Sequence, residues 1–220
     1  MVGLEVEDLQ VRARSGRVLL AVPSLSVPAG RALGVRGASG AGKSTFLFAL
    51  MGLADGAEGR VRWGETDVLS LSDAARAEFR RTRMGMIFQD FLLFDELSAG
   101  GNAAIRGLFS PKAERAGLAE AAAGLLTRLD VAAEARTVAT FSGGERQRVA
   151  VARALAHDPA IVLADEPTAS LHREAGEALT DALLTRAREA GTTVVVASHD
   201  PQVLERMDEV LTLEHGQVSV

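Results

Sequence analysis

The sequence predicts an α/β protein with a mostly parallel core sheet, an N-terminal antiparallel β subdomain and an inserted helical subdomain. Three observations support this fold class. Short strand patterns crowd the first part of the chain, apolar strands alternate with helical patterns in the last part, and a stretch rich in Ala, Leu, Glu and Arg lies between them. Alternating strands and helices pack as helices over a parallel sheet. The 220 residues suffice for one well-buried domain.

The N-terminal part of the chain predicts short strands that are mostly antiparallel. Strand patterns cover residues 4–11, 17–22 and 31–35, and a further one covers residues 61–63. The turn signal Pro28-Ala29-Gly30 precedes the third of these strands. We expect this region to combine antiparallel strands with one strand of the core sheet.

Continuous apolar runs later in the chain predict the strands of the core sheet. They cover residues 84–88, 160–164 and 193–197, and such runs suit a sheet that is covered on both faces. A helix is expected between the last two strands, over residues 173–190. Gly191 follows it and is a suitable residue for the position just past a helix end.

A helical subdomain is expected to interrupt the core. Residues 91–157 have a helical composition, and Ser110 with Pro111 supplies an N-cap and a first-turn proline for one of the helices. The whole chain, residues 1–220, is then a single domain. Residues 1–90 and 158–220 form the α/β core with its antiparallel subdomain, and residues 91–157 form the insertion.

The composition excludes several classes of protein. No apolar run approaches the roughly 20 residues that cross a bilayer, and the N-terminus lacks the basic and apolar segments of a signal peptide. The absence of cysteine excludes disulfides and thiol catalysis and is typical of a cytoplasmic protein. A net charge of −5 argues against a nucleic-acid partner, and we interpret the arginine cluster at residues 80–83 as a solvated helix face.

A phosphate-binding loop follows the predicted strand that ends at Val35. The segment has a glycine, four residues and then Gly-Lys-Ser, and a predicted helix follows, which is the context that this motif requires. Backbone N–H groups would surround the phosphates, Lys43 would neutralise them, and the Ser44 hydroxyl would bind Mg²⁺. A chance glycine-rich turn is the alternative, and the motif alone indicates only a nucleoside triphosphate. The expected nucleotide-binding residues here are Gly37, Ala38, Ser39, Gly40, Ala41, Gly42, Lys43, Ser44 and Thr45.

Two acidic residues follow the strand predicted at 160–164. Asp165 has the position of an acid that holds Mg²⁺ at a strand end. Glu166 is next and is the candidate base that polarises the attacking water. The structural alternative is that both are loop acids, with Asp165 capping a turn before Pro167.

Two further polar residues follow core strands at the edge where α/β sheets bind ligands. His199 comes after the strand at 193–197, and its position favours a contact with the γ-phosphate. Gln89 comes after the strand at 84–88 and is a candidate to orient Mg²⁺ or water. We therefore expect Glu166, His199, Gln89 and Lys43 to act in catalysis, with Ser44, Gln89 and Asp165 as metal ligands.

The segment Ser142-Gly143-Gly144-Glu145 precedes an apolar helix. Ser142 and Glu145 have the spacing of a capping box, which is the structural interpretation. That interpretation leaves the two glycines unexplained, because glycine weakens a helix start. An anion that approaches bare backbone would account for them.

With this segment, the chain resembles the ABC ATPase family. Residues 142–145 match its signature motif, in the variant with Glu where Gln is commoner. The phosphate loop matches Walker A of a P-loop NTPase core, residues 161–166 match Walker B, Gln89 matches the Q-loop and His199 the switch histidine. These motifs, in this order, span nearly the whole chain. Within the family the chain looks most like cassettes of the lipoprotein-releasing, macrolide-efflux and cell-division type.

The resemblance implies partners as well as a fold. It implies ATP and Mg²⁺ as cofactors, and a dimer of nucleotide-binding subunits in which each ATP lies between the Walker A of one subunit and Ser142, Gly143, Gly144 and Glu145 of the other. It also implies transmembrane permease subunits that follow dimer closure and opening. The chain would then be peripheral on the inner face of the cell membrane.

Two positions depart from the family pattern. The family has an aromatic residue near the end of the first strand that stacks on adenine, whereas residues 11–14 here are Val-Arg-Ala-Arg and the chain has no Tyr. The loop after Walker B usually ends in Leu-Asp, but this one ends in Leu171-His172. The departures bear on base recognition and on communication between the two ATP sites.

Three other functions remain as alternatives. ABC ATPases of translation or DNA repair carry tandem cassettes or a coiled-coil insertion, and this chain shows neither. A regulatory nucleotide-binding module is opposed by the intact Lys43, Asp165, Glu166 and His199, and a P-loop kinase would leave the signature segment unexplained. The transported cargo and its direction are not encoded in the motifs.

Overall fold

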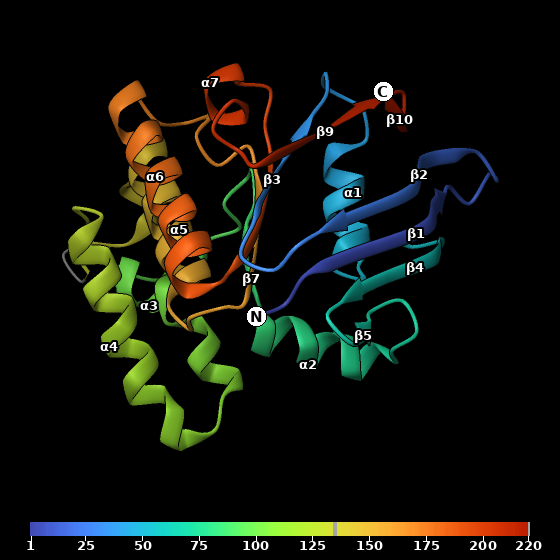
Figure 1. Ribbon diagram of the computed structural model, residues 1–220. Coiled ribbons are helices and arrows are strands. Elements are labelled where there is room, and N and C mark those ends of the chain that lie inside the picture. The colour runs from blue at the N-terminus through green and yellow to red at the C-terminus, as the bar shows by residue number, and fades with distance from the viewer. Residues whose placement is uncertain (134–135, 220) are drawn as a thin grey trace.

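The computed structural model describes residues 1–133 and 136–219. One mixed sheet runs through the protein, and its strand order is β5-β4-β1-β2-β10-β9-β3-β8-β7-β6. Figure 1 shows helices α4, α5 and α6 on one side of the central strands and the antiparallel strands with α1 on the other. The α/β fold class with a mixed sheet is therefore confirmed.

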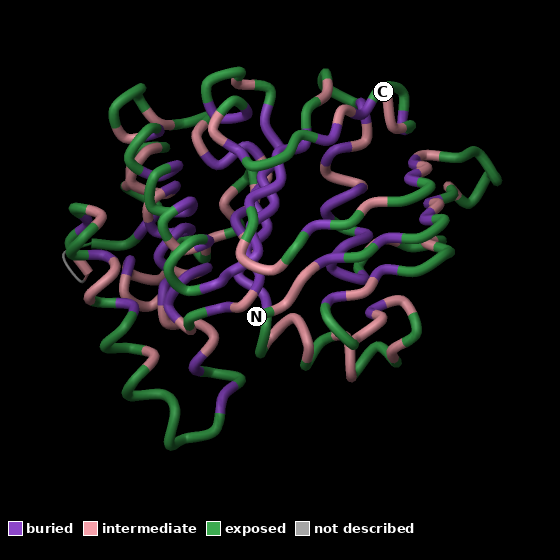
Figure 2. Tube along the Cα trace, in the orientation of Figure 1, coloured by how far each residue is buried: buried purple, intermediate pink, exposed green. Residues whose placement is uncertain are grey.

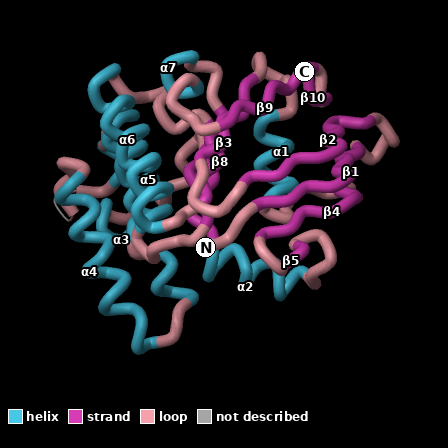
Figure 3. The backbone as a smooth tube through the Cα atoms, viewed as in Figure 1, coloured by secondary structure: helices cyan, strands magenta, loops and turns pink. Residues whose placement is uncertain are grey.

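The strands are β1 (Leu4–Arg12), β2 (Val18–Val27), β3 (Ala32–Arg36), β4 (Ala57–Trp63), β5 (Thr66–Asp67), β6 (Met84–Ile87), β7 (Ile161–Asp165), β8 (Thr193–Ala197), β9 (Glu209–Glu214) and β10 (Gln217–Ser219). The α-helices are α1 (Lys43–Leu50), α2 (Asp73–Arg83), α3 (Ala99–Ala103), α4 (Lys112–Arg128), α5 (Gly143–Leu155), α6 (Arg173–Ala190) and α7 (Pro201–Leu204), and the 3₁₀ helices are η1 (Ile105–Phe109) and η2 (Val138–Thr140). Figure 3 shows their distribution along the chain.

The parallel pairing of the central strands places their carboxyl ends at the same edge of the sheet. Strands β3, β8, β7 and β6 pair in parallel, and β9 joins β3 in parallel on the other side. Their carboxyl ends therefore lie along one edge of the sheet, where loops after parallel strands meet. The central strands are buried, as Figure 2 shows.

The antiparallel part joins the parallel part through the C-terminal strands. Strand β1 lies between β2 and β4, antiparallel to both, and β5 extends this sheet. The hairpin of β9 and β10 connects the two parts, because β9 pairs with β3 while β10 pairs with β2. The sequence patterns did not indicate this hairpin, and they ended β2 five residues early, at Val22 instead of Val27.

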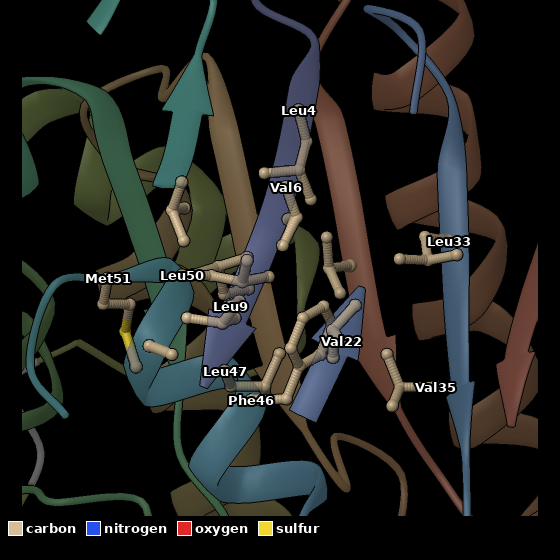
Figure 4. Packing of buried hydrophobic residues seen from close by; sticks show 14 of the residues in the cluster. Leu4, Val6, Leu9, Val22, Leu33, Val35, Phe46, Leu47, Leu50 and Met51 are labelled. Atoms are coloured by element: carbon tan, nitrogen blue, oxygen red, sulfur yellow. The ribbon is translucent and has the colours of Figure 1, made fainter. Parts of the chain in front are cut away.

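Two hydrophobic clusters cover the two faces of the parallel strands. Leu163 and Val195 point toward a cluster that contains α1 and the antiparallel strands, whereas Val162 and Val194 point toward α5 and α6. This alternation follows from the two-residue period of a strand. In Figure 4, Phe46, Leu47 and Leu50 of α1 lie against residues of the strands.

The helical insertion has a core of its own. A third cluster brings together residues of α3, α4 and α5. The prediction that Ser110 caps a helix in this region is wrong: α4 begins at Lys112, its N-cap residue is Pro111, and no side-chain cap bond forms. Ser110 instead ends η1 through its backbone bond to Gly107 and accepts a hydrogen bond from Arg81.

Helix α2 bears out the interpretation of the arginine cluster as a solvated face only at Arg83, because Arg80 and Arg81 are half-buried. The helix buries none of its residues, Arg80 donates to the carbonyl of Met51, and Arg81 pairs with Glu78. Within the described residues, no helix is both long enough and apolar enough to cross a membrane.

Candidate active site

Four strand ends bring most of the predicted residues to one pocket of about 550 Å³. The phosphate loop follows β3, Gln89 follows β6, Asp165 ends β7 and His199 follows β8. Because these four strands are neighbours in the sheet, their following residues share one edge. The predicted residues that line the pocket are Ala38, Ser39, Gly40, Gly42, Lys43, Ser44, Thr45, Gln89, Asp165, Glu166 and His199.

The phosphate loop takes its shape from its glycines. Gly40 and Gly42 have φ of 77° and 102°, which residues with a side chain rarely adopt. Gly37 lies against the sheet, where a Cβ atom would come within 2.7 Å of the Leu213 carbonyl oxygen. Ala41 is buried in the core rather than in the pocket. The loop thus presents backbone to the pocket and leads into α1, whose first turn has no side-chain cap.

Lys43 occupies the centre of the pocket. Its ammonium donates to the carbonyls of Gly37 at 2.8 Å and Ala38 at 3.4 Å, and it lies 3.4 Å from Glu166 Oε1. The side chains of Lys43 and Glu166 are only 10% and 9% exposed. A buried cation and a buried carboxylate require each other or a charged ligand, because an unpaired buried charge is costly. A triphosphate is one ligand that would satisfy the ammonium.

Glu166 is held in a strained position. Its φ is 48°, in the left-handed region, and its N–H donates to the carbonyl of Ala197 on β8. The other carboxylate oxygen lies 2.9 Å from Nδ1 of His199, whose side chain is 71% exposed. A non-glycine residue in this region costs on the order of 1–3 kcal/mol and is typical of functional sites. The backbone strain turns the carboxylate of Glu166 toward both Lys43 and His199.

Three oxygen-bearing side chains form a second group in the pocket. Ser44, Gln89 and Asp165 all line it. Burial raises the pKa of the Asp165 carboxyl, the hydrogen bond from Ser44 lowers it, and the neighbouring Glu166 raises it further. The described residues contain no group of three His, Cys, Asp or Glu side chains that would hold a metal alone. A hydroxyl, an amide and a carboxylate suit Mg²⁺, which takes its remaining ligands from phosphates and water.

The signature segment lies apart from this pocket. Ser142 is the N-cap of α5, and the predicted capping box with Glu145 is present. Gly143 and Gly144 have ordinary backbone angles, and a Cβ atom on either would meet nothing closer than 3.6 Å. The packing of the chain therefore does not require these glycines. Bare N–H groups at this helix start remain free to meet an anion from outside.

Sequence reasoning missed several residues that shape the pocket. Leu19 and Ala169 line it, and neither belongs to a recognisable motif. Arg153, on α5, is desolvated enough that its pKa falls to about 10, and it donates to the carbonyls of Phe91 and Leu92 just after Gln89. Phe91 and Leu92 both have left-handed φ, at 60° and 49°. A helix-borne arginine thus holds the loop of Gln89 in a strained shape.

The two departures from the family pattern have structural counterparts. Arg12 ends β1 and is exposed, and its guanidinium donates to Gln10 and Gly16 of its own hairpin. His172 is the N-cap of α6 but forms no side-chain cap bond.

Comparison with known proteins identifies the family. A family model described as "ABC transporter" matches residues 20–169. The ABC transporter ATP-binding protein YbbA of Escherichia coli K12, described as uncharacterized, is 37% identical over 98% of this chain and 96% of its own length. The lipoprotein-releasing system ATP-binding protein LolD of Shewanella oneidensis is 36% identical over 99% of this chain and 96% of its own length.

Solved structures give the same answer. The dimeric structure of MJ0796, described as a bacterial ABC transporter cassette, has a TM-score of 0.89 and 30% identity, and the match covers 99% of this chain and 97% of that one. The same cassette in a post-hydrolysis state with ADP and Pi has a TM-score of 0.90 with the same identity and coverage. Together with the strand-edge pocket, these similarities establish that the chain belongs to the ABC transporter family and is an ATP-binding cassette with ATPase activity.

Proposed function

We propose that two copies of this cassette, or this chain and a paired nucleotide-binding subunit, close head to tail around ATP. The single observation that carries the proposal is that the phosphate pocket and the signature segment lie on separate parts of one chain. The pocket offers Lys43 and the phosphate loop, whereas the first turn of α5 offers unhindered N–H groups at Gly143 and Gly144 elsewhere. A second chain would complete each site. The dimeric MJ0796 cassette, with its TM-score of 0.89, supports the formation of a dimer.

The contacts of Glu166 support the following roles in hydrolysis. Glu166 accepts a proton from the attacking water, since its carboxylate is fixed between Lys43 and His199. His199 donates to the γ-phosphate and orients Glu166. Lys43 leaves the carbonyls of Gly37 and Ala38 and neutralises the phosphates when ATP enters.

Mg²⁺ would be held by Ser44, Gln89 and Asp165, all of which line the pocket. When bound, the ion neutralises charge that develops on the phosphates. The hydroxyl of Ser44 lies near enough to Asp165 to lower the pKa of its carboxyl, so the two groups are placed for a common ligand. The raised pKa of Asp165 reflects a buried acid without a full cationic partner, which fits a site that receives one.

The helical insertion would pass the motion to membrane subunits. We propose that residues 91–157 act as a signature subdomain within one domain formed by residues 1–90 and 158–220, and their separate hydrophobic cluster supports that division. Leu92 and Phe94, just after Gln89, are 56% and 54% exposed. Exposed apolar side chains beside a nucleotide-sensing loop suit a partner helix from a permease. The chain would then be a cytoplasmic subunit, peripheral on the inner face of the membrane.

Glu166→Gln tests the proposed function. The variant should bind ATP, lose hydrolysis by about 10²–10⁴-fold, the usual contribution of a general base, and accumulate an ATP-bound dimer. The measurements are steady-state ATPase rate and sedimentation velocity with and without MgATP. Lys43→Ala is the matched control, because it removes phosphate binding and should give neither turnover nor dimer. Turnover near that of the unsubstituted chain would contradict the role of Glu166, and a variant that stays monomeric with saturating ATP would contradict the dimer.

A further inference from the structure

The signature segment carries a carboxylate where a phosphate would approach. Glu145 Oε2 accepts hydrogen bonds from the Ser142 N–H at 2.9 Å and from the Ser142 hydroxyl at 2.8 Å. A hydroxyl has only one proton to donate. In this arrangement the proton of Ser142 is directed at the chain's own carboxylate, and it must turn away before it can serve a phosphate oxygen.

Arg136 contacts the other side of the same carboxylate. Its Nη2 pairs with Glu145 Oε1, and its Nη1 donates to the Thr140 carbonyl at 3.1 Å. The guanidinium carbon lies 4.6 Å from the centre of the Phe141 ring. Arg136 is therefore fixed over the segment by three different contacts. The bonds from Ser142, followed by the charges of Arg136 and Arg148, lower the pKa of Glu145, so this side chain is a full anion near neutral pH.

An uncompensated anion here would oppose ATP binding. A phosphate oxygen bound by the Ser142 hydroxyl would lie within two hydrogen-bond lengths, about 5–6 Å, of the Glu145 carboxylate. Like charges at that distance repel strongly once an interface has excluded water. A guanidinium on the far oxygen of the carboxylate offsets this repulsion and weakens its hold on the Ser142 proton.

We propose that Arg136 is a positioning residue for ATP: it neutralises Glu145 and thereby frees the Ser142 hydroxyl to donate to a phosphate of the ATP bound by the partner subunit. This role rests on the proposed head-to-tail dimer. Arg136 itself touches neither the pocket nor the phosphate loop of its own chain.

The ion pair is a poor candidate for a purely structural role. The side chains of Arg136 and Glu145 are 48% and 24% exposed, and partly exposed pairs add little to the stability of a fold. The capping box does not need a charge either, since Gln forms it as well as Glu. Glu145→Gln is therefore the matched change: it keeps the cap of α5 and removes the anion that Arg136 is proposed to neutralise.

The test is a double-mutant cycle in the Glu166→Gln background. The quantity measured is the MgATP concentration at half-maximal dimer formation, from sedimentation velocity. Arg136→Gln should raise it by about tenfold when Glu145 is present and by less than about twofold in the Glu145→Gln background. Arg136→Lys, which keeps the positive charge, should recover most of the loss. Arg128→Gln removes the same charge from exposed α4 and should change the value by less than about twofold.

Each result is decisive. Equal effects of Arg136→Gln in both backgrounds would show that Arg136 acts only through Thr140 and Phe141, and would overturn the proposal. An unchanged value would overturn it as well. ATP binding by the monomer, measured with a fluorescent ATP analogue, should be unaffected, because it uses the phosphate loop. If the parent Glu166→Gln chain forms no ATP-dependent dimer, the proposed function fails, and the role of Arg136 fails with it.

Discussion

Among single residues, His172 occupies the N-cap position of α6 without capping the helix. It starts α6 without a side-chain cap bond, although this position ordinarily carries an oxygen that accepts an N–H from the first turn. Neutral imidazole can accept one hydrogen bond, whereas a carboxylate accepts several. The loop it ends, residues 168–172, also contacts the signature glycines, since Ser170 and Leu171 lie beside Gly143 and Gly144.

His172→Asp should stabilise the protein and tighten the coupling between the two ATP sites. A cap bond contributes about 1 kcal/mol, so the melting temperature should rise by a few degrees. The Hill coefficient for ATP should also rise, because a carboxylate can bond N–H groups across the dimer. The measurements are thermal unfolding and ATPase rate against ATP concentration. His172→Ala removes the imidazole without adding an acceptor and should give neither gain; identical Hill coefficients in all three proteins would rule out a coupling role.

Two residues, Arg12 and Leu19, bear on how the protein recognises the base of the nucleotide. Arg12 is held along its hairpin by Gln10 and Gly16, and Leu19 is the largest apolar residue that lines the phosphate pocket. Leu19 lacks the flat face that makes stacking worth about 1–3 kcal/mol per base. We expect a weak preference for ATP over GTP, measured as the ratio of dissociation constants in competition binding. A ratio above about a hundredfold, or roughly 2.7 kcal/mol, would show that another group recognises adenine.

Some residues of the pocket could be predicted from the sequence, and others could not. Gln89, Asp165, Glu166 and His199 were predictable because each follows an apolar strand, and parallel strands bring such positions together. Leu19 was not, because it reaches the pocket through the pairing of β2 with β10, which the local sequence does not encode. The partnership of Arg136 with Glu145 likewise depends on how a loop folds back over nine positions.

Among the elements, helix α5 is followed by a half-buried histidine just past its end. Nε2 of His157 lies 3.1 Å from the Met84 carbonyl oxygen at the start of β6, and Nδ1 is buried without a partner. Burial, with the nearby charges of Arg106 and Arg186, lowers the pKa of His157 to about 4. The unfolded chain therefore takes up a proton at higher pH than the folded chain does.

This difference predicts a loss of stability in mild acid. Between the unfolded pKa of about 6.5 and the folded pKa of about 4, the unfolded state binds more protons, so the free energy of unfolding falls as the pH falls through that window. The loss should reach about 2 kcal/mol at pH 5. Urea unfolding from pH 7 to 4.5 measures it. His157→Gln keeps a donor for Met84 but cannot take up the proton, and parallel stability curves for the two proteins would refute the prediction.

The sequence predicted the bounds of some helices and strands and missed those of others. The strands β3, β6, β7 and β8 were placed to within one residue because each is a continuous apolar run. The bounds of helix α2 were not predicted, although its arginine cluster was interpreted as a helix face, since the helix buries no residue and contains no apolar run. The hairpin of β9 and β10 was missed because its pairing partners lie some 180 residues away in the chain.

For the whole molecule, we propose that the apolar segment after Gln89 is the surface on which the cassette binds its membrane partner. Leu93 packs against the core of the helical insertion, whereas Leu92 and Phe94 are exposed. Leu92→Glu should therefore abolish co-purification with the native membrane subunits from detergent extracts while isolated ATPase activity survives. Leu93→Glu should destabilise the fold itself.

The matched control is Val18→Glu on strand β2 of the antiparallel sheet, where Val18 is 39% exposed. It adds the same charge at an exposed apolar position and should leave the complex intact. Retention of the complex by Leu92→Glu would place the docking surface elsewhere, for example around the exposed Leu108 and Phe109.

Because Arg153 donates hydrogen bonds to the loop after Gln89, the two ends of helix α5 would lie beside different nucleotides. Its first turn belongs to the signature segment and would touch the nucleotide of the neighbouring subunit, while Arg153, about 15 Å along the helix, holds the backbone beside the nucleotide of its own subunit. A helix of this length is stiff. In the proposed dimer, a displacement that one nucleotide imposes at Ser142 would therefore be transmitted along α5 to the loop beside the other nucleotide.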